Sequence, residues 1–196
     1  MDNTENNKLV QLAKELERQK QTKKDYVVSS EDIKVESQTL EDGKKVLMMS
    51  IPTLKEVGRP GENLLHHGFG MTPHTHSQIS EKLKIPKGFY DRLKDDYPEL
   101  LVRNINDLMP EKDKRLVRTL DGQVRAFLSS RYRIIDNHDI LFNSLDIFNR
   151  LNQDGAGIQV HRADLTETRL YVKAFSERLT DTIFPKKDKP DVGDAV

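Results

Sequence analysis

The sequence predicts an α+β fold with a largely antiparallel sheet of hairpins. Two Asp-Gly pairs, Asp42-Gly43 and Asp121-Gly122, each lie between runs of alternating apolar residues. This pattern is typical of a hairpin, because the tight turn needs positive φ angles that glycine tolerates. Helical patterns are grouped at about 72–109 and 137–152 instead of alternating with the strands. Such blocks favour an α+β class over a parallel α/β class.

The individual elements follow from local patterns. Residues 6–24 predict a helix whose apolar stripe stops at Leu16, so its second half is expected to be a frayed helix or a linker. Residues 33–40 predict a strand, and the nearly continuous apolar run 46–51 predicts a strand buried on both faces.

The helices have recognisable ends. Thr72-Pro73 combines a favourable N-cap with proline at the first helical position, and it predicts a helix over 72–83. Further helices are predicted at 87–93 and 98–109, and a fourth runs from a cap at Asp136 or Asn137 to Leu151. Short strands are expected at 132–135, 158–161 and 169–175.

We expect three parts along the chain. Residues 1–25 would form a charged N-terminal helix or flexible segment, and residues 26–184 a single α+β domain. Residues 185–196 leave regular structure at Pro185 and end on a strand-like residue, which predicts a linker and the start of a missing C-terminal part.

The composition narrows the function classes. The 196 residues have 35% hydrophobic and 33% charged residues, a net charge of zero and no cysteine, which excludes disulfides, thiolate zinc sites and a cysteine nucleophile. No signal-peptide core or apolar run of about 18 residues is present, so we expect a cytoplasmic protein with no membrane partner. Phosphate-binding glycine motifs and a nucleophile elbow are also absent, so no catalytic residue and no cofactor is predicted.

Positive charge gathers in one segment. Lys112 to Arg133 contains seven lysines and arginines but two carboxylates. In a tight hairpin at Asp121-Gly122, Arg118 would lie opposite Arg125 on one face, and opposed like charges destabilise a strand pair unless carboxylates or an anion neutralise them. Guanidinium groups bind phosphates in bidentate geometry, and aromatic rings stack bases. The candidate nucleic-acid-binding residues are Arg118, Arg125, Phe127, Arg131, Tyr132 and Arg133. The alternative is a solvated sheet face whose arginines pair with neighbouring carboxylates.

Two further patterns are weaker. The apolar spacing in residues 78–93 approximates a helix-turn-helix, but Lys84 occupies the turn position that glycine often fills, and Gly88 falls within the second helix. Four histidines, His66, His67, His74 and His76, are weak candidate metal ligands, since no acidic residue or cysteine completes a familiar spacing.

Three stretches together resemble a known family. They are residues 71–93, with Met-Thr-Pro-His-Thr-His, residues 116–137, with the arginine hairpin, and residues 165–173. The chain resembles the phage/plasmid-like protein family, a bacterial, phage and plasmid domain with no assigned function. The resemblance implies a phage or mobile-element setting, brings no catalytic residues, and implies further β structure after Gly193-Asp-Ala-Val196.

Three functions are therefore open. The first is a non-enzymatic accessory factor that binds nucleic acid, with single-stranded nucleic acid as the candidate partner. The second is a protein-binding module that acts on a host or phage protein. The third is a metal-dependent enzyme that uses the histidines.

Overall fold

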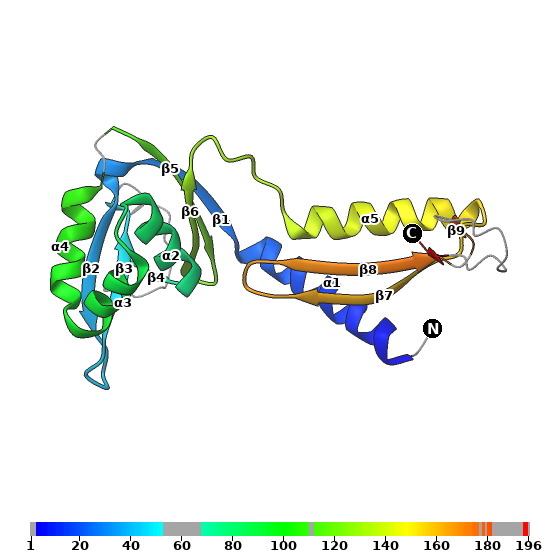
Figure 1. Ribbon diagram of the computed structural model, residues 1–196, viewed down its shortest axis with the longest axis horizontal. Helices are drawn as coiled ribbons and strands as arrows, with labels where there is room; N and C mark the ends of the chain where they lie inside the picture. The colour runs from blue at the N-terminus through cyan, green and yellow to red at the C-terminus, as the bar shows by residue number, and fades with distance from the viewer. Residues whose placement is uncertain are drawn as a thin grey trace, which may run out of the picture. The chain divides into compact units, whose positions relative to one another are not determined.

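The computed structural model describes residues 3–52, 68–109, 112–176, 178, 180–181 and 194–195. The chain forms two compact units, one from Thr22–Arg133 and the other from Met1–Gln21 together with Ile134–Val196 (Figure 1). The range 26–184, which we expected to be one domain, is thus divided after Arg133. The N-terminal helix belongs to the second unit, because its apolar side packs on residues from the C-terminal half.

The Thr22–Arg133 unit is built on a sheet with the strand order β1–β5–β6–β4–β3–β2. Its strands are β1 (Lys24–Ser29), β2 (Lys34–Thr39), β3 (Lys45–Ser50), β4 (Phe69–Met71), β5 (Lys114–Leu120) and β6 (Gln123–Ser129). Neighbouring strands are antiparallel except for the short parallel pair β4–β6. The predicted α+β class with a largely antiparallel sheet is confirmed.

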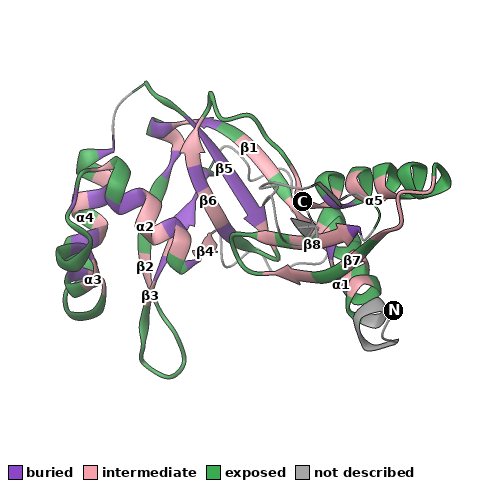
Figure 2. Cartoon of the chain, turned by 45° about the vertical axis from the view of Figure 1, so that its right-hand side comes forward, coloured by how far each residue is buried: buried purple, intermediate pink, exposed green. Residues whose placement is uncertain are grey.

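The sheet is strongly curled. Tyr26 on β1 and Phe69 on β4 are three strands apart in the sheet order, a separation of about 14 Å in a flat sheet. Their ring centroids are nevertheless 6.2 Å apart. The curl encloses one hydrophobic core, and β5 is buried at five consecutive positions, from Arg115 to Thr119 (Figure 2).

Three helices complete this unit: α2 (Pro73–Lys82), α3 (Lys87–Asp96) and α4 (Pro98–Leu108). The predicted cap is confirmed, since the Thr72 hydroxyl accepts a hydrogen bond from Thr75 N at 3.3 Å. In the turn after α2, Lys84 adopts a positive φ of 55°, and Ile85 N donates to Ser80 O at 2.9 Å. This left-handed C-terminal turn leads the chain directly into α3.

The second unit combines α1 (Asn3–Thr22), α5 (Asn137–Gln153), β7 (Ile158–Leu165) and β8 (Leu170–Ser176). Leu12 and Leu16 of α1 and Leu141 of α5 are buried together, with apolar residues of the β7–β8 hairpin against them. Two very short strands, β9 (Thr180–Asp181) and β10 (Asp194–Ala195), form a separate antiparallel pair.

Local expectations were wrong at three places. Residues 17–22 continue α1 as regular helix. Lys24 and Asp25, which we assigned to the N-terminal segment, begin β1 because β5 offers them a partner strand. Residues 132–135 form no strand, although their composition is strand-like. Within the described ranges, no helix is long and apolar enough to cross a membrane.

Candidate nucleic-acid interface

The arginine hairpin has the predicted turn. Asp121 and Gly122 have φ angles of 50° and 78°, as a tight hairpin turn requires. Leu120 pairs with Gln123, and Thr119 pairs with Val124. The nature and position of this hairpin were therefore readable from the sequence.

Beyond those two pairs the strand register changes. A bulge makes Arg125 the extra residue of β6, so that Arg118 lies opposite Ala126 and Val117 lies opposite Phe127. The expected Arg118–Arg125 cross-strand pair is wrong. A bulge leaves no mark in an alternating sequence, because one extra residue is accommodated by local backbone bending.

Helix α2 supplies partners to β6 on both sides of the bulge. Val124 O accepts hydrogen bonds from Thr72 N at 3.1 Å and from the Thr75 hydroxyl at 2.6 Å. Phe127 N donates to Gln78 Oε1 at 2.7 Å. Strand β4 pairs with β6 only through Gly70 and Met71, so the side chains of α2 satisfy the strand where β4 does not reach.

Arg118 has a carboxylate partner. It lies directly opposite Asp25 across the β1–β5 pair, and its Nε and Nη2 donate to the two carboxylate oxygens at 2.8 and 3.1 Å. The two side chains are 9% and 20% exposed. This buried bidentate pair is a structural feature of the sheet, so Arg118 does not present a guanidinium to an external phosphate. Asp25 is 93 residues away in the chain, and no local signal predicts this contact.

The Phe127 ring cannot stack on a base, because it is fully buried in the core. Arg115 is buried beside it, with its guanidinium carbon 5.6 Å from the ring centroid and Nη2 2.7 Å from Asp113. The Phe127 stacking role is therefore wrong, and the hairpin interior is structural.

The end of the hairpin is different. Arg131, Tyr132 and Arg133 follow β6 and are all exposed, Tyr132 at 52%. Ser130 N donates to Lys114 O at 3.3 Å and Tyr132 N donates to Ser129 O at 3.0 Å, which holds the start of this segment beside Lys114, the first residue of β5. In the described part of the chain, neither Arg131 nor Arg133 forms an ion pair.

Lysines extend this positive surface, and carboxylates limit it. Lys112 and Lys114 are exposed at the adjoining start of β5. Asp113 forms an ion pair with Arg115. Two further carboxylates, Glu31 and Asp32, lie on a short 3₁₀ helix (Ser30–Asp32), whose Ser30 N donates to Asp113 O at 2.7 Å. We define Lys112, Lys114, Arg131, Tyr132 and Arg133 as the cationic end; the sequence indicated the last three and missed the lysines as members of the site.

The histidines do not assemble a metal site in the residues that are described. His66 and His67 lie outside the described residues. His74 and His76 are on α2, and no group of three or more histidine or acidic side chains among the described residues is arranged to hold a metal ion.

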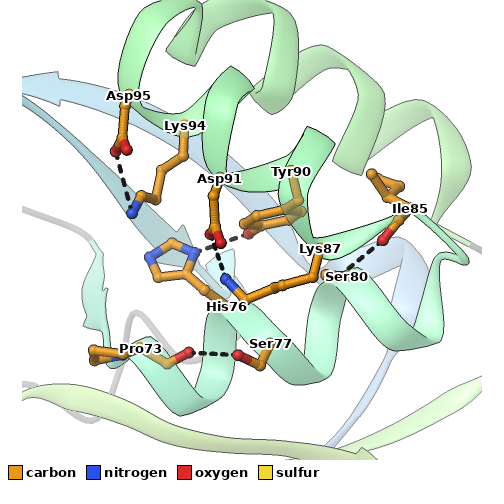
Figure 3. A network of polar contacts seen from close by, with 10 residues as sticks. All are labelled: Pro73, His76, Ser77, Ser80, Ile85, Lys87, Tyr90, Asp91, Lys94 and Asp95. Carbon is orange, nitrogen blue, oxygen red and sulfur yellow. Dashed lines mark hydrogen bonds and ion pairs between the residues drawn. The ribbon is translucent and has the colours of Figure 1, made fainter.

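His76 instead forms a contact with α3. Its Nδ1 lies 2.8 Å from the hydroxyl of the buried Tyr90 (Figure 3). Burial, followed by the charges of Lys94 and Lys87, lowers the pKa of His76 to about 4. Burial, with the charge of Asp91, raises the pKa of Tyr90, so a neutral phenol and a neutral imidazole share this hydrogen bond at pH 7.

The α2–α3 pair has the spacing of a helix-turn-helix, but its charges do not favour DNA. The cations of α3 face aspartates on the same helix: Lys87 with Asp91, Arg92 with Asp96 at 3.9 Å, and Lys94 with Asp95 at 3.2 Å. Hydrogen bonding to Lys87 also lowers the pKa of Asp91. These pairs would have to be broken for the lysines and arginine to bind phosphates, so the cationic end is the better candidate in this unit.

Comparison with known proteins adds no relative. No family model, no curated protein and no solved structure matches this chain.

Proposed function

We propose that this protein is a non-enzymatic accessory factor that binds nucleic acid, and that the cationic end is one of its contact surfaces. The observation that carries the proposal is the exposed sequence Arg131-Tyr132-Arg133 beside Lys114. A phage or mobile-element setting, which the family resemblance implies, belongs to the same proposal.

The chemistry of the cationic end fits a nucleic acid. Arg131 and Arg133, which form no ion pair with the described residues, are available to phosphate oxygens, and each such contact releases counterions from the nucleic acid. An exposed tyrosine ring between them offers a flat face to an unpaired base, and one such contact contributes about 1–3 kcal/mol. The zero net charge of the chain requires that binding depend on such a local surface.

The test is binding of labelled single-stranded and duplex oligonucleotides at several salt concentrations. The Arg131→Ala/Arg133→Ala variant is expected to bind at least about tenfold more weakly, with a slope of log affinity against log salt that is smaller by about 1.4 for a single strand and about 1.8 for a duplex. The matched control is Arg92→Ala/Arg103→Ala, which removes the same charge from two exposed helical positions. Equal loss in both variants would show that total charge alone determines binding, and no binding by the wild-type protein in low salt would refute the function.

A protein-binding function is the alternative, and α5 is the feature that favours it. Ile140, Ile147 and Leu151 are exposed at helical spacing. A pull-down from host lysate with and without nuclease separates the two functions, because a partner held through nucleic acid is lost after nuclease treatment.

A further inference from the structure

The β7–β8 hairpin has a clear inner and outer face. Apolar residues of both strands point toward the core of their unit; they are Ala163, Leu165, Leu170 and Val172. Because side chains alternate along a strand, the residues between them point to the opposite side. Paired positions on that outer face include Arg162 with Lys173 and Asp164 with Tyr171.

The opposed cations result from a second bulge. His161 is the extra residue of β7 between Val160, which pairs with Ala174, and Arg162, which pairs with Lys173. Directly opposed like charges destabilise a strand pair. The sequence suggested a cross-strand pair of cations in the arginine hairpin. Such a pair occurs instead in the second unit, where Arg162 and Lys173 are both exposed.

Only part of this positive charge is neutralised within the hairpin. Arg162, whose side chain is 71% exposed, forms an ion pair with Asp164 through Nε. Lys173 is exposed and has no ion pair within the described residues. Arg169, directly before β8, adds a third cation, and Glu167 in the connecting turn adds one carboxylate.

Aromatic rings lie among these cations. Tyr171 is 49% exposed, and its hydroxyl accepts a hydrogen bond from Arg169 Nη1 at 3.2 Å. The His161 ring contacts the Phe175 ring edge to face, with centroids 5.9 Å apart. Exposed rings interspersed with cations on a sheet surface are the arrangement with which many proteins bind unpaired nucleic acid strands.

We propose that the outer face of the β7–β8 hairpin binds single-stranded nucleic acid, with Arg162 and Lys173 on phosphates and Tyr171 stacked on a base. The face selects a single strand because the bases of a duplex are stacked within it, so the Tyr171 ring has no base face to cover. An anion between Arg162 and Lys173 also relieves the repulsion of the opposed pair. This inference rests on the proposed nucleic-acid-binding function, but it concerns a separate surface, in the other unit.

The experiment uses the full chain and a labelled oligothymidylate of about 15 nucleotides. Tyr171→Ala is expected to weaken binding by about tenfold, while Tyr171→Phe keeps the ring and binds like the wild-type protein. The control is Tyr97→Ala, which removes another half-exposed tyrosine. Arg162→Ala/Lys173→Ala is expected to weaken binding and to reduce the salt dependence, without lowering the thermal unfolding temperature, because removing an opposed like-charge pair does not cost stability.

The outcomes separate this inference from the proposed function. If the wild-type protein binds and the Arg131→Ala/Arg133→Ala variant is weakened while the hairpin variants are not, the inference is refuted and the proposed function stands. If only the hairpin variants are weakened, the inference stands and the cationic end is not the contact surface. Equal affinity for duplex DNA of the same length, or for polyglutamate, would overturn the choice of ligand.

Discussion

Replacing Arg118 tests whether this arginine stabilises the sheet or binds a ligand. Arg118→Ala would leave the Asp25 carboxylate, 20% exposed, without its bidentate partner. Removing one member of a buried ion pair costs about 3–5 kcal/mol, and the remaining exposure of Asp25 places the expected loss near the lower end, at about 3 kcal/mol. For a unit of this size, that loss lowers the unfolding temperature by roughly 10 °C or more.

The assay is urea and thermal unfolding followed by circular dichroism. Arg103→Ala is the control, because Arg103 forms an exposed i,i+4 pair with Asp107 at 3.5 Å, and its loss should cost no more than about 0.5 kcal/mol. Asp25→Leu/Arg118→Leu should recover most of the stability, since no charge is then left unpaired. If Arg118→Ala unfolds like the Arg103→Ala control but loses nucleic-acid affinity, the structural role assigned to Arg118 is wrong.

Three other changes test the fold. His76 is protonated more readily in the unfolded chain than in the folded one, where its pKa is about 4, so the free energy of unfolding should fall by up to about 2 kcal/mol between pH 7 and pH 4.5. In His76→Gln, urea unfolding should show a smaller fall over this pH range, and an unchanged fall would contradict the assigned role of His76. Gly122→Ala should lower the free energy of unfolding by about 1–2 kcal/mol, because its φ of 78° disfavours a side chain. Gly88→Ala, at a helical position with open space around it, should be neutral or stabilising, and equal unfolding midpoints of the two variants would contradict this expectation. Leu141→Ala should destabilise the second unit by about 2–5 kcal/mol in denaturant unfolding, and a loss below about 1 kcal/mol would show that α1 and α5 do not share a core.

Local chemistry made most of the elements predictable. The Thr72-Pro73 cap and the Asp121-Gly122 turn each contain the reason for their conformation within a few residues. Strand β1 was not predicted, because the strand-forming run Tyr26–Val28 is only three residues long and the polar Lys24 and Asp25 precede it. The strand conformation of Lys24 and Asp25 depends on pairing with Thr119 and Arg118. Site residues were predicted correctly as exposed only where exposure does not depend on strand register, namely at Arg131, Tyr132 and Arg133, which follow the end of β6.

The sequence by itself determined the α+β class, the two hairpins at Asp-Gly pairs and the concentration of arginines after Lys112, because turn preference and composition are local properties. Only the tertiary structure decided which cations face outward. Helix α2 satisfies β6 around a one-residue bulge, Asp25 neutralises Arg118, and a second bulge places Arg162 opposite Lys173. A shift of one residue moves each following side chain to the other face of a sheet, so the charge pattern of the surface depends on register and on distant partners.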